Sequence, residues 1–429
     1  MAFRPLAAVG LAFAGLIMTV GLRWPAATAA FGLLLLAIGP PVTIGETIGA
    51  YETEPIRKAV LILCFAPAVV RYRFDPRLLL PLAAYAALGA LGLVFSDRPM
   101  GLTGAQMVES LITLTLGWSI LAIRWPRASA PSMMHALALL PLASVLVGGV
   151  LAVVGIGLVY DVGFGGVPRL GGATIPPQLA FLAVVGISAA ILSARMFKSR
   201  AGTALAVLNG LILALTVSRG SMAAGLIVAI PSALRFVRSA RPGTGIRKEL
   251  RAIMLALMVV VAAAAIAPAV LARSSSYTEA GQLNTSGRSN AWEYFWDQAQ
   301  QSPVWGRGLG SGPVIEVPEY IERGDFTAQH NEYLRMFLEG GYVGFALVLF
   351  ALAFTLREVS RRFPSRVSAD LWALVIAFAL LSFVDNTLSA PEFAVSFLLL
   401  LGLARAMGPD EHPAPPPAHR ADSTRSVPV

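Results

Sequence analysis

The feature that most constrains this chain is its series of apolar segments, because a helix needs about 20 apolar residues to cross the hydrocarbon core of a bilayer. Charged residues make up only 13% of the sequence, against roughly 25% in an average soluble domain. In lipid, every backbone polar group must be bonded internally. We therefore predict an all-α, polytopic transmembrane helical bundle of about 12–13 spans. The segments lie near 6–22, 26–44, 57–70, 78–95, 104–123, 133–160, 178–197, 202–217, 221–236, 250–271, 336–356, 369–387 and 391–406.

Arginine clusters between these segments set the predicted orientation, since cytoplasmic loops carry an excess of Lys and Arg. The loop at 235–251 holds five arginines and Lys248 against one acid, Glu249. Topology thus accounts for the net charge of +9, and we expect no nucleic acid partner. By alternation, further basic turns near 71–77, 124–127, 195–200 and 357–366 share this side, and 161–177, 218–220 and 272–335 lie opposite.

The same pattern divides the chain into four parts. Residues 1–271 are predicted to form transmembrane helices with short loops, and 336–406 the C-terminal transmembrane helices. Between them, 272–335 forms one long outer loop, with five arginines against eight carboxylates, so it is not a basic membrane anchor. The polar, proline-rich tail at 407–429 is predicted to be disordered and cytoplasmic.

Several catalytic signatures are missing from the sequence. It contains no Walker A loop, no Gly-x-Gly-x-x-Gly after a strand and no His-Glu-x-x-His. This argues against ATP-driven transport and zinc proteolysis. The single cysteine, Cys64, lies in an apolar run and lacks the spacing of a metal site. We predict no metal and no cofactor.

His330 stands apart from the other histidines, because it ends the long outer loop just before a helix re-enters the membrane. An imidazole can take a proton from a hydroxyl at neutral pH, and this position at the membrane surface suits a lipid-linked substrate. The alternative is a surface histidine that only packs at a helix start. Spacing alone does not separate these interpretations.

Three arginines on the outer side are candidates for binding phosphate, and one of them, Arg219, runs against the topology rule. Arg219 lies in a tight turn between two apolar helices, where a guanidinium can hold phosphate oxygens through paired hydrogen bonds. Arg288 begins a predicted loop helix, and Arg169, in the glycine-rich loop, is a weaker candidate of the same kind. The alternatives are an interfacial arginine that snorkels to water for Arg219 and a solvated helix-start arginine for Arg288.

Polar residues near His330 complete the predicted substrate-binding set. Asn331, Glu332 and Arg335 follow it directly, although Glu332 and Arg335 are also spaced as an ordinary helix salt bridge. Asp385 interrupts an apolar run, and an acid at that depth usually has a partner or a function, unless it only marks the helix end.

Three stretches together resemble the O-antigen ligase and polysaccharide polymerase superfamily of bacterial inner-membrane proteins. Each is weak alone, but their order, spacing and shared membrane side make the combination specific. The motif-bearing part spans roughly 169–345, and the other helices match only in being apolar. The stretches are Ser218–Ser221, Ser286–Trp292 with Ser302–Gly310, and Gln329–Leu334 with Glu339–Gly344.

The resemblance implies a fold related to the C-type glycosyltransferases, with a periplasmic active site in the inner (cytoplasmic) membrane. It implies a glycan donor carried on undecaprenyl pyrophosphate, with Arg219 and Arg288 binding the pyrophosphate and His330 activating the acceptor hydroxyl. Guanidinium groups can stabilise a leaving diphosphate without a metal, and displacement from the opposite face inverts the anomeric carbon. We therefore expect metal-independent, inverting transfer.

The acceptor is less constrained than the donor. The string from His330 to Gly341 is closer to exopolysaccharide polymerases, which extend a glycan chain, than to ligases that use the lipid A core. A flippase and a chain-length regulator are expected partners besides the lipid bilayer. From a different class, a transporter of lipid-linked or small solutes fits the many apolar helices. We see no internal repeat, however, and a carrier does not need a 64-residue outer loop.

Overall fold

A computed structural model describes residues 3–38, 50–162, 167–239, 288–317 and 328–409. The described chain is almost entirely helical, which confirms a helical membrane protein. Its α-helices are α1 (Phe3–Arg23), α2 (Pro25–Ala37), α4 (Ala50–Arg71), α5 (Leu80–Phe95), α6 (Gly104–Ala122), α7 (Ala130–Val153), α8 (Pro176–Met196), α9 (Arg200–Leu215), α10 (Arg219–Ser239), α12 (Arg288–Gln300), α14 (Glu332–Ser360), α15 (Ser368–Leu381) and α16 (Pro391–Ala406).

Five helical segments in the described residues are long and apolar enough to cross a membrane. Shorter apolar helices, among them α2, α9 and α15, accompany them. The predicted span at 250–271 lies outside the described residues. The five long segments are Pro76–Phe95, which includes the 3₁₀ turn η1 (Pro76–Leu79), Gly104–Ala122, Arg127–Val153, which includes η2 (Arg127–Ser129), Pro176–Met196 and Glu332–Ser360.

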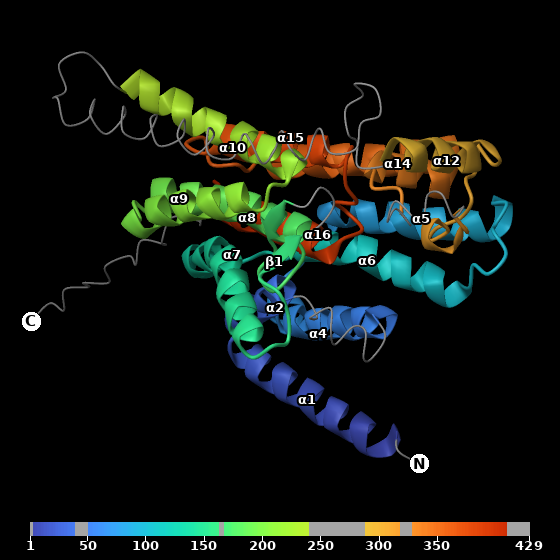
Figure 1. The fold of residues 1–429 in the computed structure, drawn as a ribbon, viewed down its shortest axis with the longest axis horizontal. Coiled ribbons are helices and arrows are strands. Elements are labelled where there is room, and N and C mark those ends of the chain that lie inside the picture. The colour runs from blue at the N-terminus through green and yellow to red at the C-terminus, as the bar shows by residue number, and fades with distance from the viewer. Residues whose placement is uncertain (1–2, 39–49, 163–166, 240–287, 318–327, 410–429) are drawn as a thin grey trace, which may run out of the picture.

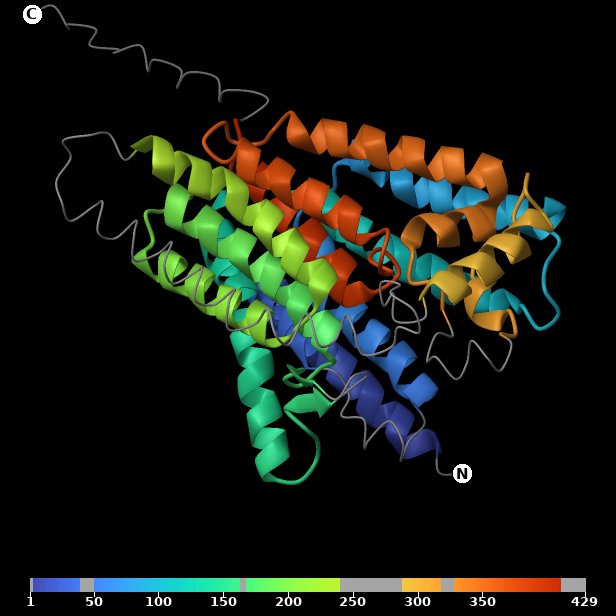
Figure 2. The ribbon, with the colours of Figure 1, turned by 45° about the horizontal axis from the view of Figure 1, so that its top comes forward.

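Helices α8 and α16 form the centre of the bundle. Most residues of α8 and nearly every residue of α16 are buried, as expected for a helix that is apolar all round. Helix α16 contacts α6, α7 and α8, while α10 packs against α8 and α15. On the other side of α16, α14 packs against α5 and carries α12 on its surface (Figures 1 and 2).

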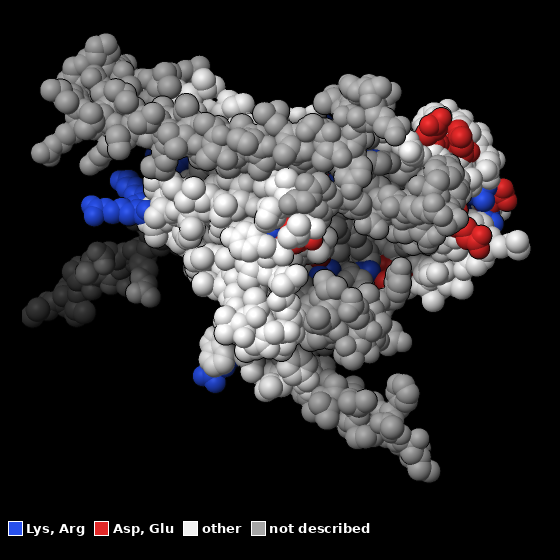
Figure 3. All heavy atoms as spheres, in the orientation of Figure 1, with Lys and Arg blue, Asp and Glu red and all other residues white. Residues whose placement is uncertain are grey.

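The arginine-rich turns meet at one end of the bundle, as the loop pattern predicts. Arg195 in the last turn of α8 and Arg235 in α10 both pair with Asp370 at the start of α15. Asp75 pairs in the same way with Arg405 and, at 3.8 Å, with Arg362. On the face seen in Figure 3, Lys and Arg gather at one end of the molecule and Asp and Glu at the other, over α12. Which end faces the cytoplasm stays a prediction.

The glycine-rich loop at 161–177 differs from a purely α-helical expectation. Tyr160–Val162 (β1) and Pro168–Leu170 (β2) pair as a short antiparallel hairpin, with Asp161 opposite Arg169. Helix α7 ends at Val153, ahead of the predicted 160, because the chain turns at Gly155, which has φ of 78°. The start of α14 also differs from its prediction. This helix, which follows the predicted outer loop at 272–335, begins at Glu332, four residues before the predicted 336, because Asn331 caps it.

Candidate active site

Four predicted residues gather at the end of the bundle opposite the arginine-rich turns. Arg219 begins α10, Arg288 begins α12, His330 precedes α14 and Asp385 lies between α15 and α16. Arg219 and Asp385 both act electrostatically on the Arg288 guanidinium. Asp385 Oδ1 lies 3.5 Å from His330 Nδ1. We call these four residues the open cluster, because His330 and Asp385 keep 31% and 19% of their side-chain surface exposed.

Arg288 is held in the site by the amphipathic helix α12. Ala291, Phe295 and Ala299 are buried and seat this helix on α14. Burial lowers the pKa of the Arg288 guanidinium; the Asp385 carboxylate opposes this shift, and the like charge of Arg219 adds to it. Arginine stays charged at neutral pH even so. Within the described residues, its Nε is buried and has no hydrogen-bond partner.

Arg219 is positioned by a strained turn between α9 and α10. Val217 has φ of 49°, a left-handed conformation that β-branched residues rarely adopt. The Thr216 hydroxyl supports the turn, since it donates to Leu213 O at 2.6 Å and accepts from Ser218 N at 3.4 Å. Arg219 thus stands at the start of α10, where the helix dipole adds positive potential.

The start of α10 also packs closely on the segment that carries Asp385. A Cβ at Gly220 would lie 3.2 Å from both Leu381 Cδ1 and Val384 Cγ2. This close approach brings Arg219 beside the turn at Asp385. The left-handed conformation of Val217, just before Arg219, is a strained backbone of the kind that concentrates at functional sites.

His330 is also held in a left-handed conformation, with φ of 43°. Trp292 Nε1 donates to the carbonyl of Gln329 at 2.8 Å, which fixes the chain just before His330. After it, the Asn331 side chain caps α14 and accepts from Tyr333 N and Leu334 N, each at 3.1 Å. The imidazole is therefore presented from a backbone that is anchored on both sides.

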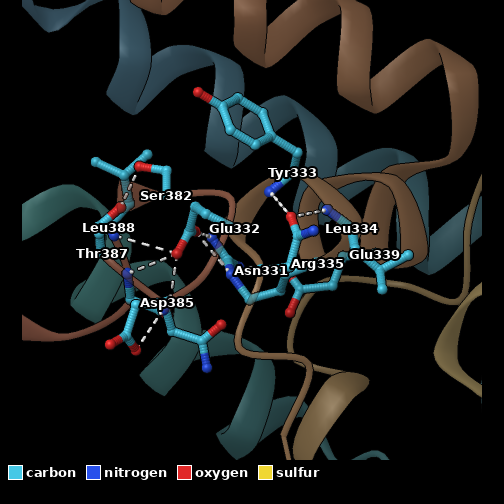
Figure 4. A network of polar contacts seen from close by, with 12 residues as sticks. Asn331, Glu332, Tyr333, Leu334, Arg335, Glu339, Ser382, Asp385, Thr387 and Leu388 are labelled. Atoms are coloured by element: carbon cyan, nitrogen blue, oxygen red, sulfur yellow. Dashed lines mark hydrogen bonds and ion pairs between the residues drawn. The ribbon is translucent and has the colours of Figure 1, made fainter. Parts of the chain in front are cut away.

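A second cluster of charged side chains lies in the first turns of α14, the helix that follows His330. Arg335 donates to Glu332 Oε1 through Nε at 2.8 Å and also through Nη2, and its Nη1 donates to Glu339 Oε2 at 2.8 Å. All three side chains are almost fully buried. Glu332 also reaches the loop that carries Asp385 (Figure 4). We call Glu332, Arg335 and Glu339 the closed cluster; substrate binding by Glu332, Arg335 and Asn331 stays a prediction.

Arg169 lies apart from this arrangement. It pairs with Asp161 at 2.6 Å across the β1–β2 hairpin. No ion pair or hydrogen bond among the described residues joins it to the open cluster. A role in substrate binding remains a prediction for Arg169.

An apolar cavity of about 580 Å³ opens beside the open cluster, between α12 and α14. Its walls are mainly aromatic, and Asn331, the neighbour of His330, forms part of them. Helix α12 therefore presents Arg288 to the charged site and, one turn later, Trp292 to the cavity. The other lining residues are Glu293, Trp296, Tyr333, Leu334, Phe337, Tyr342 and Phe345.

The glycine-rich stretch 302–310 fits into a kink of α14. Gly341 has φ of 58° and ψ of −162°, and a Cβ there would lie 2.4 Å from Val304 O. The freed carbonyls of α14 accept from the loop, with Arg307 N bonded to Leu338 O at 2.7 Å. Gly306, also at positive φ, could not carry a Cβ without meeting the Glu339 backbone at 2.5 Å. These two motifs therefore interlock and hold α12 against α14.

Sequence reasoning missed several residues that shape the site. Trp292 belongs to a motif stretch, but nothing in the sequence indicates its bond to Gln329. Glu339 also belongs to a motif stretch, and its buried contact with Arg335 was not predicted above. Glu392 at the start of α16 is buried and pairs with Arg57 of α4, while Gln178 donates to it at 3.2 Å.

Residues 204–349 match the sequence model of a family described as O-antigen ligase. The match runs from α9 into α14 and includes Arg219, Arg288 and His330, while Arg169 and Asp385 lie outside it. It confirms the resemblance to the O-antigen ligase-like superfamily over this part of the chain. A comparison with curated proteins found no match to this chain.

Proposed function

We propose that this protein is a periplasmic-face glycosyltransferase that extends a surface polysaccharide or exopolysaccharide from a glycan donor on undecaprenyl pyrophosphate. The observation that carries this proposal is the open cluster, which brings two arginines together with a histidine–aspartate pair beside an apolar cavity. Cationic groups beside a base suit a reaction in which a diphosphate leaves and a hydroxyl attacks.

The two arginines are assigned to the donor. Guanidinium groups bind phosphate oxygens through paired, charge-assisted hydrogen bonds. Arg219 and Arg288 stand close enough to repel each other, and an anion between them relieves that repulsion. Negative charge grows on the diphosphate as the sugar–phosphate bond breaks, so the same contacts strengthen toward the transition state.

His330 and Asp385 are assigned to the acceptor. The acceptor hydroxyl oxygen attacks the anomeric carbon, the bond from that carbon to the phosphate oxygen breaks, and undecaprenyl pyrophosphate leaves with the electron pair. His330 takes the hydroxyl proton, and Asp385, 3.5 Å from Nδ1, stabilises the imidazolium that forms. A single displacement of this kind inverts the anomeric configuration and needs no metal. A product with retained configuration, or loss of activity on chelation, would contradict this mechanism.

The aromatic cavity supports a lipid-linked substrate. Its apolar walls suit an isoprenoid segment or the face of a sugar ring, and it lies next to the charged site. An amphiphilic donor could thus place its diphosphate at the arginines while its neighbouring apolar part lies between α12 and α14.

The second candidate is an O-antigen ligase that transfers the glycan to the lipid A core, which the description of the matching family favours. The deciding experiment compares surface and secreted glycans of a deletion strain, with wild-type or His330→Ala copies restored. Loss of polymer with a normally decorated lipid A core supports the polymerase. Long glycan that stays on undecaprenyl pyrophosphate supports the ligase. No glycan change with either copy would contradict both and favour a transporter.

A further inference from the structure

The loop between α15 and α16 is tied to α14 by one buried side chain. Glu332 Oε2 accepts from Leu388 N at 3.1 Å, and from Ser389 N and Ser389 Oγ at 3.4 Å each. The Glu332 backbone N–H donates to Ser382 O at 2.8 Å at the other end of the loop. Asp385 lies between these two attachment points, so Glu332 is hydrogen-bonded to the chain on both sides of Asp385 (Figure 4).

The closed cluster leaves one oxygen of the Glu332 carboxylate without a donor on α14. Two carboxylates, Glu332 and Glu339, share the single cation Arg335. Arg335 donates to Oε1 of Glu332, so Oε2 needs hydrogen-bond donors from another segment. A buried charge is costly unless hydrogen bonds satisfy it, and the donors that do so belong to the Asp385 loop.

The two oxygens of Glu332 have separate tasks. Oε1 accepts from Arg335, which fixes the side chain on α14. Oε2 faces the loop and accepts its donors. A neutral amide cannot do both, because its nitrogen donates rather than accepts. The carboxylate is therefore required for a bridge from α14 to the loop.

We propose that Glu332 is a positioning residue that holds the Asp385 loop in register with His330, and that Arg335 serves it as an anchor. His330 and Glu332 are two residues apart, on the two sides of Asn331, so one short stretch of chain sets both partners of the 3.5 Å contact. The expected effect of Glu332 on transfer rests on the proposed function, whereas its expected effect on the loop does not.

The loop has a second attachment that the proposed bridge does not involve. Glu392, just after the loop, pairs with Arg57 of α4. Removal of the Glu332 carboxylate should therefore loosen the loop near Leu388 without detaching α16 from the bundle. Glu332→Gln also leaves Arg335 paired with Glu339, so no buried cation is stranded. The variant is expected to fold.

The test compares Glu332→Gln with Glu358→Gln, which makes the same change near the other end of α14, where Glu358 pairs with the exposed Arg361. In purified protein in lipid nanodiscs, Glu332→Gln should lower kcat by about 10–100-fold with the KM for donor nearly unchanged, since small misplacements at a reacting centre cost about that much. Glu358→Gln should keep wild-type kcat. Wild-type kcat in Glu332→Gln would overturn the proposal.

A double-mutant cycle separates positioning from a merely structural role. If Glu332 acts through Asp385, then in an Asp385→Asn background the further change Glu332→Gln should cost less than about threefold in kcat, because groups that act as a unit are not additive. If the loss of kcat in the double variant equals the product of the losses in the two single variants, Glu332 acts independently of Asp385, and the proposal is overturned.

Amide hydrogen exchange provides the readout that does not depend on the reaction. Exchange at Leu388 and Ser389 should be faster in Glu332→Gln than in wild type and unchanged in Glu358→Gln. Unchanged exchange at these amides in Glu332→Gln would overturn the bridge. A wild-type protein without transferase activity would refute the proposed function, and the exchange result would still decide whether Glu332 holds the loop.

Discussion

Two charged clusters meet at the start of α14, and they differ in what their charges face. In the closed cluster, Arg335 contacts both of its carboxylates directly, and the side chains are almost fully buried. In the open cluster, no ion pair within 4 Å joins Arg288 to Asp385 among the described residues, and part of the His330 side chain is exposed. Residues of the same types thus form a buried scaffold in one place, and we propose that they form a ligand site in the other, where part of the His330 and Asp385 surface is exposed.

The largest expected effect falls on the open cluster at His330. His330→Ala should lower transfer by about 10²–10⁴-fold, the usual contribution of a general base. Transfer is measured as release of undecaprenyl pyrophosphate, and thermal unfolding should be unchanged. The matched control is His135→Ala at the opposite end, whose ring bonds to Pro131 O at 2.7 Å and Ser199 Oγ at 3.1 Å. Equal losses in the two variants would contradict the assignment.

The arginines of the open cluster should show the next largest effect. Arg288→Lys and Arg219→Lys should each lower kcat/KM by about 10²–10³-fold, because an ammonium keeps the charge but loses the planar pair of donors. Steady-state kinetics with a lipid-linked donor measures this. The control Arg361→Lys changes an exposed arginine at the other end of α14 and should be silent. A fully active Arg288→Lys would argue against paired hydrogen bonds to the diphosphate.

A stability effect is expected where the glycine-rich loop meets α14. Gly341→Ala should lower the free energy of unfolding by about 2–4 kcal/mol, since the backbone conformation is strained for alanine and the Cβ meets Val304 O. Thermal unfolding in detergent measures it. Gly149→Ala in α7, where a Cβ would contact nothing within 4 Å, should not destabilise. Equal stability of the two variants would refute the interlock.

The smallest effect on activity is expected at Arg169. Its partner is Asp161 in the same hairpin, so Arg169→Gln should change kcat by less than about threefold while the hairpin loses this ion pair. Donor kinetics check this. A loss as large as that of Arg288→Lys would show that Arg169 contacts the donor and would extend the open cluster to the hairpin.

The helices were predictable from the sequence, but several of their ends were not. Apolar length located α5, α6, α8 and α14, because lipid leaves a long apolar segment few alternatives. The Asn331 cap sets the start of α14, and the turn at Gly155 ends α7, since helix ends depend on capping that apolar length does not report.

The candidate site was predictable where local sequence carries the chemistry. Arg219, Arg288 and His330 each stood out in a motif at a helix start. The contact between His330 and Asp385 was not predictable, because tertiary packing of α10, α14 and α15 creates it. The bridge from Glu332 to Leu388 likewise joins segments far apart in the chain, and i, i+3 spacing indicated only its bond to Arg335.

The most direct test of the account is transfer by the purified protein in a defined lipid bilayer. Undecaprenyl-pyrophosphate-linked glycan is supplied as both donor and acceptor, and the products are analysed for new glycosidic bonds and for free undecaprenyl pyrophosphate. The account predicts one undecaprenyl pyrophosphate released for each new bond, with inverted configuration, and no turnover with His330→Ala. Movement of the donor across the bilayer without any new bond, unchanged in His330→Ala, would contradict it.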